Sequence, residues 1–174
     1  MRKDADTPSD AGGTYDDATD SLQAIRDILQ SATVNVTAVV DGDVITVVRG
    51  DTLVADLDGL GDISNYVKLW FTVKRDRDDA DSASILQVLL TNPTVATDGL
   101  QYLNAAAATA SQGSIAVDDA SAGDITVTVN EAATAQLAGQ ACVYDVQVLR
   151  STGAVSTLTE GECDINADVT RATS

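Results

Sequence analysis

Hydrophobic and polar residues alternate along most of the chain after residue 33, which is the pattern of strands that bury one face. In the run YVKLWFTVK, residues 66–74, the odd-numbered positions form one apolar face, and the even-numbered positions from Tyr66 to Lys74 form the other. Similar runs lie at 34–40, 44–48, 52–57, 84–91, 114–117 and 124–129. Turn signals separate them at intervals of about 8–12 residues, which is typical of a sandwich. The pattern predicts a mainly β fold, an antiparallel β-sandwich over residues 33–171.

The last predicted hairpin is LAGQACVYDVQVLRSTGAVSTLTEGECDINADVTR, residues 137–171. A two-residue turn at Thr152-Gly153 would pair residues whose numbers add up to 305, as 152 and 153 do. Cys142 would then lie opposite Cys163, with both thiols on the core side beside Tyr144. The two cysteines are predicted either to form a disulfide after release from a reducing cytoplasm, or to remain two small buried hydrophobic side chains in contact.

Two segments before this hairpin are less regular. Residues 99–113, GLQYLNAAAATASQG, fit either a short strand followed by a loop or a helical turn through the alanine run. Residues 131–137, EAATAQL, predict a short helical turn.

A helical period is confined to residues 15–31, YDDATDSLQAIRDILQS. Its apolar residues recur at intervals of three and four, and they are Tyr15, Ala18, Leu22, Ile25 and Leu29. This seam covers little more than two heptads, fewer than a coiled coil needs. The segment is predicted to be either an oligomerisation helix or an amphipathic helix that packs on its own sandwich. Residues 1–14 are polar and predict a flexible N-terminal arm without a secretory signal.

The composition argues against several classes of function. The 174 residues include no histidine, the commonest general base and metal ligand, so we expect no enzyme activity, no metal and no cofactor. Aromatic residues make up only 3% of the chain, and so thin a core favours self-association, with a homotrimer as the expected state. A net charge of −17 disfavours binding to nucleic acid or to an anionic membrane.

Two surface features are candidate sites. Trp70 and Phe71 lie on opposite faces of one predicted strand, so one of them points away from the core unless the strand is buried on both sides. We expect Tyr66 and Trp70 to form an interface, covered by the helix at 15–31 or by a neighbouring subunit. The acidic run KRDRDDADS at 74–82 offers carboxylates to Ca²⁺ but lacks the spacing and glycine of an EF-hand loop, so we expect a solvated loop.

Three segments resemble a known family. They are GDTLVADLDGL at 50–60, YVKLWFTVKRD at 66–76, and AQLAGQACVYDVQVLRSTGAVSTLTEGECDINADVTR at 135–171. These segments are similar to the immunoglobulin-like sandwich of phage baseplate upper proteins and of related head-fibre and tail proteins. The resemblance implies an immunoglobulin-like fold and a component of a virion, without implying which part of the virion.

These observations together predict a non-enzymatic structural component of a tailed-phage virion. It would be a capsid-attached fibre or decoration protein, or a baseplate or tail component, that assembles with itself and docks on other virion proteins through the N-terminal arm. The alternative is a receptor- or carbohydrate-binding module, which would need Tyr66, Trp70 and Tyr102 to share an open groove.

Overall fold

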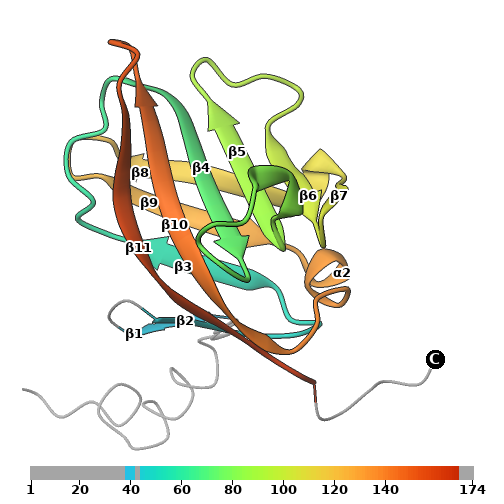
Figure 1. Ribbon diagram of the computed structural model, residues 1–174. Helices are drawn as coiled ribbons and strands as arrows, with labels where there is room; N and C mark the ends of the chain where they lie inside the picture. Colours follow the sequence, from blue (N-terminus) through green and yellow to red (C-terminus); the bar gives the residue numbers. More distant parts are fainter. Residues whose placement is uncertain (1–37, 42–43, 169–174) are drawn as a thin grey trace, which may run out of the picture. The chain divides into compact units, whose positions relative to one another are not determined.

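The computed structural model describes residues 38–41 and 44–168 (Figure 1). The chain divides into two units between Val34 and Asn35, and all described residues belong to the second unit. The predicted arm at 1–14 and the predicted helix at 15–31, with its seam, lie outside the described residues and stay predictions.

The described residues form two β-sheets around one hydrophobic core (Figure 1). The larger sheet has eight strands in the order β1-β2-β11-β10-β4-β5-β6-β7, and the smaller has three in the order β3-β9-β8. The strands of the larger sheet are β1 (Ala38–Asp41), β2 (Val44–Val48), β4 (Tyr66–Lys74), β5 (Leu86–Thr91), β6 (Gly99–Leu103), β7 (Ala106–Ala107), β10 (Gln140–Arg150) and β11 (Val155–Asn166). Those of the smaller sheet are β3 (Leu53–Leu57), β8 (Gly113–Asp119) and β9 (Asp124–Val129). Three short helical elements are η1 (Asp81–Ala83), η2 (Ala110–Gln112) and α2 (Glu131–Thr134).

The strand order identifies the fold. The closing hairpin of β10 and β11 lies in the larger sheet, where β10 also pairs with β4, and β5 and β6 widen the sheet beyond β4. A three-stranded sheet packed against a sheet that holds the closing hairpin and two added strands is the variable-type immunoglobulin arrangement. The predicted immunoglobulin-like, mainly β sandwich is therefore confirmed. One exception to the antiparallel prediction is the pair of β2 and β11, which is parallel.

The core is built from the alternating inward positions of both sheets. In β4 the buried hydrophobic residues are Leu69, Phe71 and Val73, all on one face of the alternation, and Thr72 of the other face is buried as well. Phe71 is fully buried, and its ring centroid lies 5.8 Å from that of Tyr144 on β10. Because Phe71 fills the core, Trp70 is the member of the pair that points to the outer face.

The turn of the β10–β11 hairpin differs from the prediction. The amide of Arg150 donates to the carbonyl of Ala154, and the amide of Gly153 donates to the carbonyl of Arg150, both at 2.9 Å. The loop therefore consists of residues 151–153, whereas the prediction placed a two-residue turn at Thr152-Gly153. Gly153 takes the left-handed conformation, with φ of 83°, that the last residue of such a three-residue loop requires.

The predicted pairing of the cysteines is nevertheless confirmed, because two offsets cancel. Next to the turn, Leu149 pairs with Val155, and these numbers add up to 304 rather than 305. An irregularity between Val146 and Gln147 then shifts the register by one residue. Cys142 consequently lies directly opposite Cys163.

The two less regular segments are also settled. Residues 99–103 form β6, and part of the alanine run adds the short strand β7 to it instead of winding into a helical turn. The predicted turn at 131–137 is present as α2, which begins after Asn130. The side-chain oxygen of Asn130 accepts a hydrogen bond from the amide of Ala133 at 3.1 Å and so caps the first turn.

Gly123 lies where the turn between β8 and β9 is hydrogen-bonded to the loop that precedes β4. Its carbonyl accepts a hydrogen bond from the amide of Leu60, and that of Ala122 accepts one from Gly61. A Cβ atom at Gly123 would lie 2.1 Å from the carbonyl oxygen of Gly61. We therefore expect Gly123→Ala to destabilise the domain strongly, because the two backbones must separate.

Gly153→Ala is the matched control for this substitution. Gly123 and Gly153 have nearly the same φ, 80° and 83°, but a Cβ atom at Gly153 would meet nothing within 4 Å. Alanine at Gly153 should cost only the strain of the left-handed conformation, about 1 kcal/mol. Alanine at Gly123 should cost about 1–3 kcal/mol more in the free energy of unfolding measured in urea. Equal costs would show that the contact with Gly61 relaxes freely.

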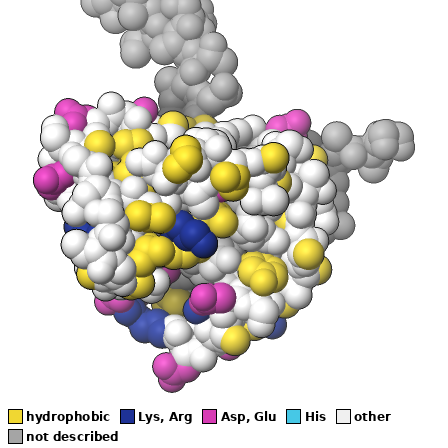
Figure 2. Space-filling view, turned by 90° about the horizontal axis from the view of Figure 1, so that it is seen from above, with side chains coloured by type: hydrophobic (Ala, Val, Ile, Leu, Met, Phe, Trp, Pro, Cys, Tyr) yellow, Lys and Arg dark blue, Asp and Glu magenta, His cyan; other side chains and the backbone are white. Residues whose placement is uncertain are grey.

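Seen from the end that holds the β10–β11 turn, hydrophobic and polar side chains are mixed on the surface (Figure 2). Several Asp and Glu side chains lie toward the margin of this view, with a few Lys and Arg side chains between them (Figure 2). On this face the charged side chains are scattered rather than gathered in one patch, which suits a solvated surface.

Candidate functional site

The outer face of the eight-stranded sheet carries a row of polar side chains. The strand registers place Glu160, Asp145, Thr72, Gln87 and Tyr102 next to one another on β11, β10, β4, β5 and β6. Because directly paired residues of antiparallel strands share a face, this row runs across five neighbouring strands.

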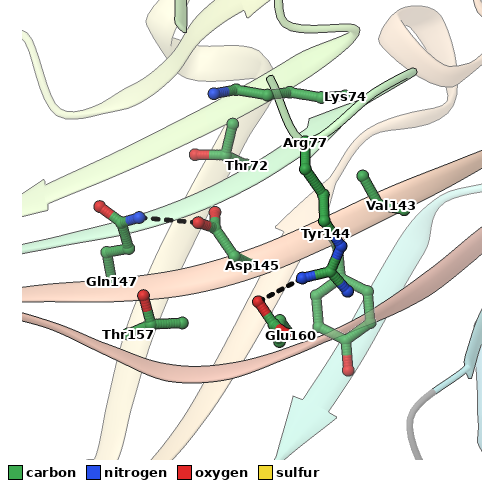
Figure 3. A pocket seen from close by; sticks show the side chains of 9 residues that line it. All are labelled: Thr72, Lys74, Arg77, Val143, Tyr144, Asp145, Gln147, Thr157 and Glu160. Atoms are coloured by element: carbon green, nitrogen blue, oxygen red, sulfur yellow. Dashed lines mark hydrogen bonds and ion pairs between the residues drawn. The ribbon is translucent and has the colours of Figure 1, made fainter. Parts of the chain in front are cut away.

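Two adjoining hollows lie over this row, and together we call them the Asp145 groove; Figure 3 shows the first of them. Both are lined by Thr72, Asp145 and Gln147. The first, of about 230 Å³, is further lined by Lys74, Arg77, Val143, Tyr144, Thr157 and Glu160. The second, of about 220 Å³, is further lined by Trp70, Asp81, Gln87 and Val155. Asp145 therefore lies where the two hollows meet.

The connection between β4 and β5 forms one wall of the groove and is held there by two ion pairs. Lys74, at the end of β4, pairs with Asp81 of η1 at 2.8 Å. Arg77 pairs with Glu160 of β11 at 2.5 Å, which takes it across β10 (Figure 3). The two pairs join the connection to the sheet. Together they balance the charges of four side chains that line the groove.

The floor of the groove is polar yet well packed. Thr72 and Gln87 are only 5% and 6% exposed, and the side-chain amide of Gln87 donates to the hydroxyl of Thr72 at 3.3 Å. The side-chain amide of Gln147 donates to Oδ2 of Asp145 at 2.8 Å (Figure 3). Buried polar groups that are hydrogen-bonded in this way hold a fixed geometry.

The electrostatics of the groove set Asp145 apart from the other carboxylates. Partial burial raises the pKa of Asp145, against the lowering effects of the hydrogen bond from Gln147 and of the charge of Lys74; Asp81 and Glu160 raise it further. In contrast, the hydrogen bond and charge of Arg77 lower the pKa of Glu160. Asp145 is thus a carboxylate whose charged form the folded protein disfavours.

This shift makes a prediction for stability against pH. Since the pKa of Asp145 is higher in the folded than in the unfolded chain, its stabilising contribution is present at low pH and is lost as the pH rises through the folded value. Asp145→Asn should therefore raise the melting temperature near pH 7 and have no such effect below about pH 3. Asp58→Asn is the control, because it removes an exposed carboxylate outside the groove. A higher melting temperature for both variants would point to net charge instead.

The predicted interface residues lie in different surroundings. Trp70 lines the second hollow, and the ammonium of Lys68 lies 5.9 Å from the centroid of its ring. Tyr66 is partly buried and packs against the hydrophobic core. Neither Tyr66 nor Tyr102 lines the Asp145 groove. An interface at Tyr66 and Trp70 stays a prediction.

The two cysteines are buried, free thiols. Burial, together with the neighbouring Cys142 and Asp164, raises the pKa of Cys163 to about 12. The pKa of Cys142 is also raised by burial, which the charge of Arg75 partly offsets. Neither thiol is activated in the folded domain, and the predicted disulfide stays a prediction.

Within residues 38–41 and 44–168, no group of three or more Cys, Asp or Glu side chains is arranged to hold a metal ion. The described part of the chain also contains no helix that is long and apolar enough to cross a membrane.

Sequence reasoning did not single out the Asp145 groove. Its residues come from β4, β5, β10, β11 and the β4–β5 connection, which are up to 90 positions apart in the chain, from Trp70 to Glu160. The one local signal is Asp145 itself, a charged residue in the middle of a long alternating strand. A carboxylate there must face the outer surface of a central strand, where neighbouring strands surround it.

Comparisons with known proteins identify no family for this chain. No family model and no curated protein matches the chain. Among solved structures, it is similar to NK cell receptor Nkp44, at 17% identity over 74% of this chain and 100% of that chain, with a TM-score of 0.41. It is also similar to the extracellular portion of mouse CD200RLa, at 11% identity over 73% of this chain and 56% of that one, with a TM-score of 0.35. A third similar structure comes from VGSC beta subunits, at 8% identity over 76% and 98% of the two chains, with a TM-score of 0.35. The assignment of the fold rests on the strand order described above.

Proposed function

We propose that the chain is a non-enzymatic structural component of a tailed-phage virion. The observation that carries the proposal is where the three family-like segments fall in the fold. The segment at 50–60 contains β3, the segment at 66–76 contains β4, and the segment at 135–171 contains β10 and β11. The resemblance therefore concerns strands from both sheets and the closing hairpin, which build the core, rather than variable loops.

The chemistry of the described residues supports a non-enzymatic role. The chain has no histidine. Asp81 and Glu160, the two carboxylates that flank Asp145 in the groove, are engaged in ion pairs with Lys74 and Arg77. Arg77 lowers the pKa of Glu160, which makes that carboxylate a poor general base.

In this proposal the protein acts by assembly and docking. The arm at 1–14 attaches it to other virion proteins, the helix at 15–31 joins copies of the chain, a trimer being favoured, and the sandwich is the exposed domain. It would be a capsid-attached fibre or decoration protein, or a baseplate or tail component. Neither nucleic acid nor a membrane is a partner, in keeping with the charge of −17.

Deletion of residues 1–14 tests the docking step. The truncated chain should fold, because the sandwich begins after these residues, but it should no longer be incorporated into particles during phage growth. The measurement is the amount of tagged chain that co-sediments with purified particles, with the full-length chain as the control. Normal incorporation of the truncated chain would contradict an anchoring role for the arm.

Substitutions in the predicted seam test self-association separately. Leu22→Asp together with Ile25→Asp should convert the oligomer to monomers in light scattering, because charged residues at seam positions cannot pack. Asp20→Asn and Asp27→Asn together form the control, since they lie off the seam, and should leave the molecular mass unchanged. A wild-type chain that is already monomeric in solution and in the particle would contradict this step.

A receptor- or carbohydrate-binding module is the second candidate function. It is favoured by Trp70, which lines a hollow together with the amide of Gln87 and the carboxylate of Asp145. Tyr66 and Tyr102 do not join it there, and Tyr144, which lines the other hollow, is buried, so the groove lacks the platform of three exposed rings. Binding on a glycan array that Trp70→Ala abolishes would favour this second function over the first.

A further inference from the structure

We infer that the Asp145 groove is a docking site for an arginine side chain carried by a basic segment of a partner protein. This inference does not rest on the virion assignment, since it concerns the isolated sandwich and any partner with such a segment.

The first observation is the charge balance within the groove. Five charged side chains line it, and four of them form the two ion pairs of the β4–β5 connection. Asp145 is the remaining one, and within the described part of the chain it lies in no ion pair. Gln147 donates to Oδ2 of Asp145, and no described side chain donates to Oδ1. The groove therefore presents one carboxylate that an incoming cation can pair with.

The second observation is the aromatic ring beside this carboxylate. Trp70 and Asp145 line the same hollow. The ammonium of Lys68 lies 5.9 Å from the centroid of the Trp70 ring, a distance at which the ring attracts a cation. A guanidinium is planar, so it can stack on an indole and still donate to a carboxylate, which a compact ammonium does less well.

The third observation is the volume of the hollow and the net charge of the chain, which together indicate the kind of occupant. The hollow that Trp70 lines is the half of the groove that the side chain enters, and at about 220 Å³ it has room for a single side chain. A second copy of this chain also carries a net charge of −17 and is repelled, whereas a basic segment is attracted.

The site is built before any ligand arrives. Thr72 and Gln87 are buried and hydrogen-bonded to each other beside Asp145. The two ion pairs join the β4–β5 connection to the sheet at the side of the groove. An arginine that enters the groove therefore meets groups that are already ordered, which lowers the entropic cost of binding.

The test is an NMR titration of the full chain with Nα-acetyl-arginine amide, with the neutral Nα-acetyl-citrulline amide as the matched probe. The arginine probe should shift the amide signals of Thr72, Asp145 and Gln147 saturably at millimolar concentration, the range expected for so small a ligand. The citrulline probe should not. Asp145→Asn should weaken binding of the arginine probe at least about tenfold, as expected for the loss of one charge-assisted hydrogen bond.

Asp58→Asn is the control, because it changes the net charge equally at an exposed position outside the groove. It should bind the arginine probe like the wild-type chain at physiological ionic strength, where distant charges are screened. Three results would overturn the inference: no saturable shifts, equal binding of the citrulline probe, or an equal loss in both Asn variants. Dispersed amide signals in each variant show that it has folded.

Discussion

Replacing Phe71 with alanine should cost about 3–5 kcal/mol of the free energy of unfolding, a large part of what a domain of this size has. Phe71 is the largest of the fully buried side chains, and its ring packs against that of Tyr144. The neighbouring ring of Tyr144 is itself buried in the core, so it cannot fill the space without leaving its own place. The cost therefore includes a cavity in addition to the lost burial.

Trp70→Ala is the control for this substitution, because it removes a larger ring from the adjacent position on the outer face. It should cost less than about 1.5 kcal/mol, since partly exposed side chains lose less burial. Urea unfolding of both variants gives the comparison. A larger cost for Trp70→Ala than for Phe71→Ala would mean that the strand presents its other face to the core.

Oxidation should join Cys142 to Cys163 and raise the free energy of unfolding by up to about 3 kcal/mol, the value for a closed loop of about 20 residues. The two residues are direct cross-strand partners, and both are buried. With oxidised glutathione, one cysteine thiolate first forms a mixed disulfide and releases one reduced glutathione. The second thiolate then displaces the other glutathione, so two protons leave the cysteines and two glutathiones are reduced.

The raised pKa of Cys163, about 12, also predicts when this bond forms. Only the thiolate attacks a disulfide, so the reaction should be slow in the folded domain and fast when the chain refolds in the same glutathione buffer. Mass spectrometry of a non-reduced digest measures the bond in each sample. The variant Cys142→Ser is the control and should show no gain in stability on oxidation. Two thiols that stay unbonded after oxidative refolding would support the alternative of buried, unlinked cysteines.

The strands could be predicted because alternation is a local property of the sequence. Each second residue of β9 is buried, as is each second residue of β10 from Cys142 to Val148, as the pattern required; in β4 the outer-face residue Thr72 is buried as well. The core side of β4 was harder to choose, because Trp70 and Phe71 give both faces a large ring. The choice depends on Tyr144 of β10, which packs on Phe71 and is more than 70 residues away in the chain.

In the final hairpin, the contact of the two cysteines was predicted correctly, although the prediction had the wrong turn and did not include the irregularity. The three-residue loop and the irregularity at Val146 each move the register by one residue, in opposite directions. A loop of three residues has weaker sequence signals than a two-residue turn, and the irregularity has none that alternation reveals. The pairing of Cys142 with Cys163 was predicted, but the path of the chain between them was not.

The sequence reveals only part of the Asp145 groove. Alternation assigns Asp145 and Gln147 to the outer face, but it cannot show that the β4–β5 connection reaches back over them. The sequence suggested a solvated loop at 74–82. Most residues of that loop are exposed, as predicted, and Lys74, Arg77 and Asp81 also form ion pairs at the side of the groove.

The virion assignment is tested most directly by locating the chain in an electron-microscopy map of purified phage particles, with mass spectrometry of the same particles. We expect the chain to be present in a fixed number of copies per particle. We also expect a sandwich with the strand order β2-β11-β10-β4-β5-β6 to fit density on the outside of the capsid, baseplate or tail. Its absence from mature particles, with the chain found only in the soluble fraction of the lysate, would contradict a structural role in the virion.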